Sequence, residues 1–263
     1  MPIVYNPFAR FYDLEYGHKE DDLPFYLDLA DACGGPVLEI GAGTGRVTFE
    51  IARAGFDVWG IDDSAKMLAI AAKKAKTLRP EIRGKIHLHQ ADMRQFDLPK
   101  RFPLCIIPFR TFLHNLTQPD QLATLQAIRR HLLPGGILAF DLFVPVHQVL
   151  ANHEWQIDIP AAELADPQQG VSLSAQITHD PAAQRLTITN TYHHTRRGEA
   201  QQHTARMKYR YIFRPEMELL LLHSGFTLRA CHGGFMDEPY DFHSGIMCFI
   251  AEKTAKRTRK AQT

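Results

Sequence analysis

Three glycines spaced two residues apart, Gly41, Gly43 and Gly45, constrain the fold of this chain more than any other feature. They directly follow the apolar run 37–40 and precede a segment with helical apolar spacing. Because glycine has no side chain, it permits a tight strand-to-helix turn and lets a ligand approach the backbone. The pattern predicts a βαβ unit with a ligand at this turn, although a tight turn without a ligand has the same glycines.

Short apolar runs alternate with helix-spaced segments over residues 36–142, which predicts repeated βαβ units. We expect an α/β fold: a doubly wound, mostly parallel, seven-stranded Rossmann-like sheet with a small antiparallel β-sheet inserted in it. The expected strands are 37–40, 57–61, 85–89, 104–108, 137–140, 227–230 and 246–251. Period-2 alternation within 171–213 predicts the inserted sheet, with turns at Asp180-Pro181 and Arg197-Gly198.

These segments divide the chain into four parts. Residues 1–148 are expected to form an N-terminal strap and a ligand-binding core, 149–213 the inserted sheet, 214–252 a helix and strands that complete the core, and 253–263 a basic tail. Ser64 and Thr117 are placed to cap helices, and Pro215 to open one. The four cysteines lie far apart without C-x-x-C spacing, so we expect reduced thiols and no metal.

The formal net charge of +1 gives no overall field that attracts nucleic acid or an anionic membrane. The longest aliphatic run, 219–222, is too short to span a bilayer, and the N-terminus lacks the features of a signal peptide. We therefore expect a cytoplasmic protein that acts on small molecules.

Two carboxylates flank the glycines and narrow the choice of ligand. Asp62 ends the second expected strand, about 20 residues past the first glycine, where it can accept hydrogen bonds from both hydroxyls of an unphosphorylated ribose. Glu39 precedes glycines spaced G-x-G-x-G, one residue shorter than the dinucleotide pattern. A carboxylate beside the loop repels a pyrophosphate but suits a ligand that carries an ammonium and a sulfonium, as S-adenosylmethionine (SAM) does.

Taken jointly, Glu39-x-Gly41-x-Gly43-x-Gly45, Gly60-Ile61-Asp62-Asp63-Ser64 and Met67-Leu68 resemble the class I SAM-dependent methyltransferases. The resemblance covers roughly residues 12–141 and, less specifically, the C-terminal strands. It implies methyl transfer from SAM, release of S-adenosylhomocysteine, and no metal. In that family the glycine loop borders the methionine part of SAM, Glu39 orients its amino group, Asp62 holds the ribose, and Asp92 meets the adenine amino group. The residues implied at the cofactor are Tyr12, Glu39, Gly41, Ala42, Gly43, Thr44, Asp62, Asp63, Met67, Ala91, Asp92, Met93, Pro108 and Phe109.

The methyl acceptor is expected beside residues 108–115, because doubly wound sheets bind ligands at the carboxyl ends of their strands. No N-P-P-Y type sequence occurs there, which argues against a flipped base as acceptor. Phe11-Tyr12-Asp13 and His114 resemble features of the aminosugar N-methyltransferase branch, in which a tyrosine segment folds over SAM and a histidine lies near the acceptor. We expect His114 to act as a base and Tyr12 to orient the acceptor. With 14 histidines present, a surface or packing role for His114 is the alternative. The acceptor pocket is assigned to Arg110, Phe112 and His114.

Two further segments have more than one interpretation. The N-terminal aromatic residues Tyr5, Phe8, Phe11, Tyr12 and Tyr16 form either a lid over the cofactor or a cover for a sheet edge. In the inserted sheet, strand alternation separates Arg206, Lys208, Arg210 and Arg214 from Met207, Tyr209, Tyr211 and Phe213. The basic face is either solvated or binds an acceptor anion, and the aromatic face either covers the active site or forms a homodimer contact.

The leading hypothesis is transfer of a methyl group to a nitrogen or oxygen of a small molecule. An NAD-dependent oxidoreductase shares the glycine loop, but Glu39 and the glycine spacing disfavour it. A non-catalytic SAM-binding regulatory protein is a third hypothesis. Nucleic-acid or protein methylation ranks lower, because it depends on the basic strand face and on the cations of the tail, Lys253, Lys256, Arg257, Arg259 and Lys260.

Overall fold

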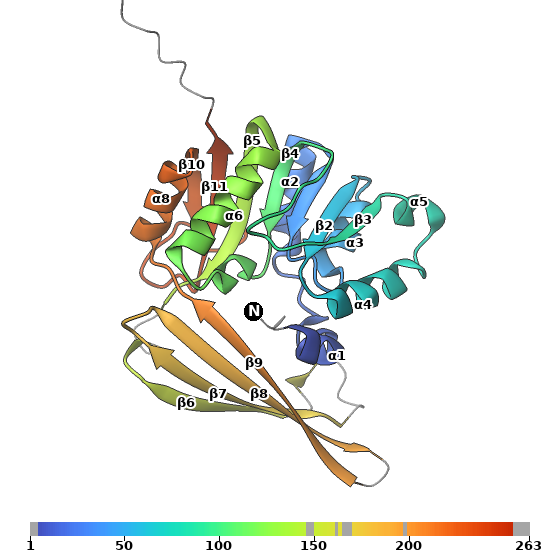
Figure 1. Ribbon diagram of the computed structural model, residues 1–263, viewed down its shortest axis with the longest axis vertical. Coiled ribbons are helices and arrows are strands. Elements are labelled where there is room, and N and C mark those ends of the chain that lie inside the picture. The colour runs from blue at the N-terminus through green and yellow to red at the C-terminus, as the bar shows by residue number, and fades with distance from the viewer. Residues whose placement is uncertain (1–4, 146–149, 161–162, 165–169, 197–198, 255–263) are drawn as a thin grey trace, which may run out of the picture.

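The computed structural model in Figure 1 describes residues 5–145, 150–160, 163–164, 170–196 and 199–254. Its main sheet has seven strands in the order β10-β11-β5-β4-β1-β2-β3. They are β1 (Val37–Ile40), β2 (Val58–Asp62), β3 (Ile86–Gln90), β4 (Phe102–Ile107), β5 (Leu132–Phe143), β10 (Phe226–His232) and β11 (Ile246–Lys253). Only β11 runs antiparallel to its neighbours, so the predicted doubly wound, mostly parallel sheet is confirmed.

Helices cover both faces of this sheet because successive strand residues point to opposite sides. On one face, Val37, Val58 and Leu104 pack with apolar residues of α2 (Leu23–Cys33) and α3 (Arg46–Arg53). On the other, Leu38 and Leu138 pack with residues of α6 (Gln118–His131) and α8 (Arg214–His223). The remaining helices of the core are α4 (Ala65–Ala75), α5 (Pro80–Arg83) and the 3₁₀ turn η1 (Thr111–His114).

The predicted helix caps are present. The Ser64 hydroxyl accepts a hydrogen bond from the Met67 N–H at 3.2 Å and begins α4. The Thr117 hydroxyl accepts one from the Asp120 N–H at 3.2 Å and begins α6. Each cap satisfies a backbone donor that the helix itself leaves unpaired, and so fixes where the helix starts. No described helix is long and apolar enough to cross a membrane.

A second sheet of four antiparallel strands leaves the core after β5 and returns to it at α8. Its strands, in sheet order, are β6 (Glu154–Ile159), β7 (Ser172–Asp180), β8 (Arg185–Arg196) and β9 (Glu199–Arg210). The expected inserted segment, 149–213, includes β6, but the alternation that predicted strands began at residue 171 and did not identify this largely exposed edge strand. The turn predicted at Arg197-Gly198, the boundary at 148/149 and residues 255–263 of the basic tail lie outside the described residues.

The two faces of β9 differ as the alternation predicts, with two corrections. Met207 and Tyr209 are buried, whereas Arg206 and Lys208 are exposed. Arg210 is buried rather than solvated, because its guanidinium donates to Glu216 at 2.7 Å and to the side chains of Gln121 at 3.2 Å and Gln184 at 2.6 Å. Phe213 is 43 % exposed rather than part of the aromatic face, since it follows the end of β9 and precedes α8.

Helix α1 (Tyr5–Tyr16) lies between the main sheet and the inserted sheet (Figure 1). Its Phe11 ring stacks on Tyr192 of β8 with centroids 4.0 Å apart. Its Asp13 carboxylate accepts a hydrogen bond from the Thr44 hydroxyl at 2.7 Å and forms a 2.6 Å ion pair with Lys74 of α4. The first helix is thereby joined to the glycine loop on one side and to the inserted sheet on the other.

Candidate active site

The glycine loop closes tightly on the main sheet at the carboxyl end of β1. Gly41, Gly43 and Gly45 have φ values of 76°, 57° and 91°, in the left-handed region that favours glycine. A Cβ atom on Gly41 would lie 2.4 Å from the methyl carbon of Thr111 in η1. The loop and η1 are therefore in direct contact, and glycine at position 41 is what allows that contact.

Most described N–H groups of this loop already have protein acceptors. The N–H groups of Gly41 and Ala42 both donate to the Ile61 carbonyl, at 2.8 and 3.0 Å. The N–H of Gly43 donates to the Asp62 carboxylate at 2.9 Å, and that of Gly45 to the Ala42 carbonyl at 2.9 Å. A pyrophosphate would need such donors for itself. The loop fits a ligand that packs against it without a phosphate group, and SAM is such a ligand.

Asp62 lies at the end of β2 with its carboxylate turned toward the glycine loop. Its two oxygens accept from the N–H groups of Gly43, at 2.9 Å, and Ser64, at 2.8 Å. A carboxylate has about four lone-pair sites, so acceptor capacity for two ribose hydroxyls remains. Burial raises the pKa of Asp62 to about 6 despite these two bonds. Met67 is buried beside Gly43, where its methyl carbon would lie 3.5 Å from an added Cβ.

Glu39 is buried beneath the loop, and its described hydrogen bond comes from the Thr48 hydroxyl of α3. Burial, with a smaller contribution from the neighbouring Asp62, raises the pKa of this carboxyl to about 8. A cation bound at the loop would reverse that effect by stabilising the ionised form. Thr48, which holds the carboxyl in place, was missed by the sequence interpretation. Thr48 lies on the first turn of α3, so helical spacing from Gly45 is the signal that would have identified it.

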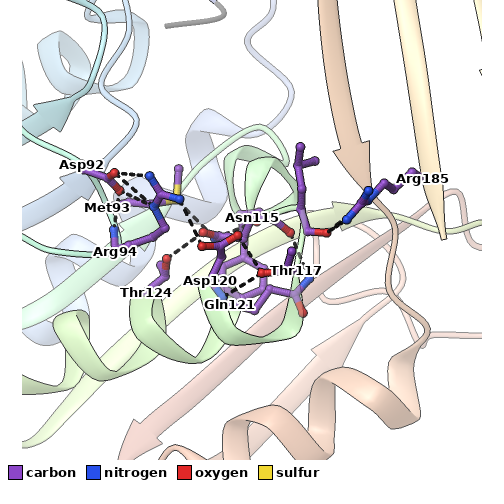
Figure 2. A network of polar contacts seen from close by, with 11 residues as sticks. Asp92, Met93, Arg94, Asn115, Thr117, Asp120, Gln121, Thr124 and Arg185 are labelled. Atoms are coloured by element: carbon purple, nitrogen blue, oxygen red, sulfur yellow. Dashed lines mark hydrogen bonds and ion pairs between the residues drawn. The ribbon is translucent and has the colours of Figure 1, made fainter. Parts of the chain in front are cut away.

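Asp92, predicted to meet an adenine amino group, is held by a neighbour instead. The Arg94 guanidinium donates to it from Nε at 2.9 Å and lowers its pKa, while another Arg94 nitrogen pairs with Asp120 of α6 at 3.1 Å (Figure 2). Figure 2 also shows Met93, whose sulfur accepts from the Asn115 side-chain amide at 3.3 Å. Arg94 was not identified from the sequence, although it lies only two residues from Asp92.

The loop after β3 still reaches the proposed ribose site. The Ala91 N–H donates to the backbone carbonyl of Asp62 at 3.0 Å, so these two strand ends lie side by side. Asp63 lies beside them at the surface, and partial desolvation of its carboxyl together with the charge of Asp92 raises its pKa. The structure therefore places Asp62, Asp63, Ala91 and Asp92 at one edge of the site.

The chain leaves β4 through two consecutive left-handed residues, Phe109 (φ 56°) and Arg110 (φ 53°). Such a conformation costs a non-glycine residue on the order of 1 kcal/mol or more and persists only where surrounding contacts enforce it. The contacts come from Asp141 of β5, whose carboxylate accepts from the Phe109 N–H at 2.6 Å and from the Arg110 N–H at 3.1 Å. Tyr26 of α2 donates to the same carboxylate at 2.6 Å. Neither Asp141 nor Tyr26 was predicted.

The residues predicted for the acceptor pocket lie in different environments. Phe112 is fully buried and packs on Phe140, with ring centroids 5.7 Å apart. The 3₁₀ turn directs its side chain into the core, whereas the sequence analysis assigned it to the acceptor pocket. Arg110 lies over the ring of Phe109 at 4.5 Å and lines an open cavity.

His114 contacts the inserted sheet. Its Nδ1 lies 3.1 Å from the Lys208 carbonyl oxygen, and its ring lies 4.6 Å from that of Tyr209. A carbonyl only accepts, so Nδ1 carries the hydrogen and Nε2 is the unprotonated nitrogen of the neutral ring. Burial lowers the pKa of His114 to about 4. The imidazole is therefore neutral at physiological pH.

Tyr12 of α1 lies beside both halves of the site. Burial raises the pKa of its hydroxyl, and the charges of Arg46, Asp62 and Arg110 act on it. The hydroxyl is therefore protonated at neutral pH and can donate a hydrogen bond. Its ring packs between those of Phe8 and Tyr16, at 5.6 and 5.4 Å.

A cavity of about 580 Å³ opens where the end of α1 meets the end of β4. Its walls include Glu15, Tyr16, Lys19, Glu20, Phe109 and Arg110. This volume lies within the range of small-molecule sites. Phe109 and Arg110 thus connect the cavity to the loop region that approaches Gly41.

Comparisons with known proteins agree with this geometry. A family model described as a methyltransferase domain matches residues 37–136. The chain is 27 % identical over 255 residues to the putative methyltransferase YqeM of Bacillus subtilis (strain 168), covering 96 % of this chain and 98 % of that protein. It is 29 % identical over 142 residues to a dTDP-3-amino-3,6-dideoxy-alpha-D-glucopyranose N,N-dimethyltransferase of Streptomyces fradiae, covering 51 % and 52 %. The solved structure of the CcbJ methyltransferase from Streptomyces caelestis is similar, with a TM-score of 0.84, 25 % identity, and coverage of 96 % and 98 %.

Proposed function

This chain belongs to the class I SAM-dependent methyltransferases, and from that premise we propose that it methylates a nitrogen or oxygen of a small-molecule acceptor. The observation that supports the proposal most is the contact between Gly41 and Thr111, because it brings the glycine loop next to the segment to which we assign the acceptor. Bound SAM supplies a methyl group on a sulfonium, which is a good leaving group. Alignment of the nucleophile then provides much of the rate.

We assign cofactor binding to the groups that converge around the glycine loop. Asp62 holds the ribose through its remaining acceptor sites, and Met67 packs beside it. Glu39 lies beneath the loop, where a cationic ligand stabilises its ionised form. Asp92 contacts the adenine edge while its carboxylate stays paired with Arg94.

We assign acceptor orientation to Tyr12 and His114. The protonated Tyr12 hydroxyl donates a hydrogen bond, and the unprotonated Nε2 of His114 accepts one from an N–H or O–H of the acceptor. With a pKa of about 4, His114 aligns the nucleophile but does not retain its proton. A small molecule is favoured by the cavity of about 580 Å³ and by the aminosugar substrate in the name of one relative.

Calorimetric titration with SAM, S-adenosylhomocysteine and NAD tests the cofactor assignment. We expect binding of the first two and none of NAD; tight NAD binding without SAM binding would contradict it. Incubation with methyl-labelled SAM and the small-molecule fraction of a cell extract tests the activity. Label in a small molecule supports it, label only in protein or nucleic acid contradicts the acceptor class, and SAM binding with no label in any fraction identifies a non-catalytic SAM-binding protein.

A further inference from the structure

Glu15 is a buried carboxylate in the wall of the acceptor cavity that the assignments above do not use. It lies on α1, one residue before Tyr16, and only 9 % of its surface is exposed. It lines the cavity together with Phe109 and Arg110, the residues that follow β4. A carboxylate is rarely buried unless it is paired, so its position here requires an explanation.

The hydrogen-bond partners of Glu15 are neutral. The hydroxyl of Tyr192 and the side-chain amide of Asn190, both in β8, donate to its carboxylate, the amide at 3.3 Å. The Tyr16 hydroxyl bonds to it as well. Within the described ranges Glu15 forms no ion pair, although the charge of Arg110 lowers its pKa. These donors hold the carboxylate in one place without neutralising its charge.

Asn190 provides a second, independent observation. Only 3 % of its surface is exposed, and its Oδ1 accepts no hydrogen bond from the described residues, although its Nδ2 donates to Glu15. Leaving a buried acceptor without a donor is unfavourable, because the group loses its hydrogen bonds to water and gains none in the protein. No cationic side chain among the described residues donates a hydrogen bond to this carboxylate or to this amide oxygen.

We propose that Glu15 recognises the acceptor, and that the acceptor is an amine that binds as its ammonium ion. This inference rests on the proposed methyl transfer and names the class of nucleophile that it uses. An ammonium donates up to three hydrogen bonds and balances the buried negative charge. A hydroxyl donates only one hydrogen bond and carries no charge. An acidic acceptor is excluded at this position by charge repulsion.

The same carboxylate accepts the proton that the amine must lose before it reacts. That proton passes from the ammonium nitrogen to an oxygen of Glu15. The freed lone pair on nitrogen then forms the N–CH₃ bond while the S–CH₃ bond breaks and its electron pair stays on sulfur. Burial raises the pKa of Glu15, which makes it a better proton acceptor than an exposed carboxylate and a better one than His114 with its lowered pKa.

The test compares the wild type with Glu15→Gln and the matched control Glu20→Gln, an exposed carboxylate in the wall of the same cavity. Each protein receives methyl-labelled SAM and a small-molecule extract, half of which has been N-acetylated in water to block its amines. In the wild type we expect label in cation-exchange-retained products, and loss of that label in the acetylated half. Glu15→Gln should reduce transfer by about 100-fold in a folded protein whose SAM affinity is unchanged, and Glu20→Gln should act as the wild type.

The outcomes separate this inference from the proposed function. Label in neutral or acidic products, or full transfer by a folded Glu15→Gln, overturns the role of Glu15 while methyl transfer stands. A wild type that binds SAM and labels nothing overturns both proposals.

If Glu15→Gln fails to fold, Tyr192→Phe provides the second variant. It removes a donor that lowers the pKa of Glu15, so the acid limb of the pH–rate profile should move to higher pH. If the acid limb of the Tyr192→Phe profile stays at the wild-type pH, the proposal is contradicted.

Discussion

The Asp141 carboxylate lies 2.6 Å from the backbone nitrogen of Phe109 and accepts its hydrogen bond across the end of the main sheet. Because the second oxygen accepts from the N–H of Arg110, one buried side chain fixes two consecutive left-handed residues between the glycine loop and the cavity at the end of β4. The geometry of the cavity wall therefore depends on a residue that does not line it.

Asp141→Asn should destabilise the chain and slow methyl transfer. An asparagine keeps one accepting oxygen but turns an N–H₂ group toward one of the backbone donors. We expect a loss of about 1–3 kcal/mol in the free energy of unfolding, measured by chemical denaturation, and a lower kcat. Tyr26→Phe, which leaves both backbone bonds in place, should retain most of the turnover. Wild-type turnover in Asp141→Asn would show that Phe109 and Arg110 hold their conformation without this carboxylate.

The variants Gly41→Ala and Gly55→Ala distinguish the effect of backbone strain from that of the close contact with Thr111. Both glycines have positive φ values, 76° and 101°, but a Cβ on Gly55 meets no atom within 4 Å, whereas one on Gly41 meets Thr111 at 2.4 Å. Gly55→Ala should cost roughly 1 kcal/mol of stability and leave SAM affinity unchanged. Gly41→Ala should cost more and weaken SAM binding, as measured by denaturation and calorimetry. Equal effects of the two changes would argue against the loop contact.

The affinity for SAM should rise with pH below pH 8. The Glu39 carboxyl has a pKa of about 8 in the ligand-free protein, and a cationic ligand favours its ionised form, so binding releases a proton. Affinity should then fall by about tenfold for each pH unit below 8 until the pKa of the bound state is reached. Calorimetry in buffers of different ionisation enthalpy counts the released proton. Glu39→Gln should abolish this dependence, and an unchanged slope in that variant would assign the proton to another group.

The variant His114→Asn distinguishes two roles for His114: alignment of the nucleophile and removal of its proton. Asparagine can place its N–H₂ group where Nδ1 donates to the Lys208 carbonyl, but it has no equivalent of Nε2. We expect a higher KM for the acceptor and a kcat lower by about tenfold, with an unchanged acid limb in the pH–rate profile. If the variant removes that limb, His114 rather than Glu15 holds the proton.

The parallel core was predictable because its signals are local. Each buried strand is a short apolar run, and Ser64 and Thr117 lie where their helices begin. Asp62 was identified by its position at the end of a strand, and that position fixes its distance from the glycine loop. Local sequence also placed the inserted sheet, except for β6, an exposed edge strand that buries little apolar surface.

The acceptor side was less predictable because its contacts are long-range. Glu15 and Tyr192 are separated by 177 positions, and Phe109 and Asp141 by 32, so no spacing rule connects them. The burial of Phe112 was not predicted for a related reason. Its neighbour Arg110 faces the cavity, but the intervening 3₁₀ turn directs Phe112 into the core.

The docking of α1 against β8 determines when α1 can join the folding chain. The residues of the methyltransferase domain, 37–136, leave the ribosome before β8 exists, whereas α1, although made first, must wait for Tyr192 and Asn190. Contacts of such long sequence separation form late and open first. Hydrogen exchange should therefore be faster in α1 than in β1 or β4, and the nascent chain acquires its cofactor loop before it acquires a place for its substrate.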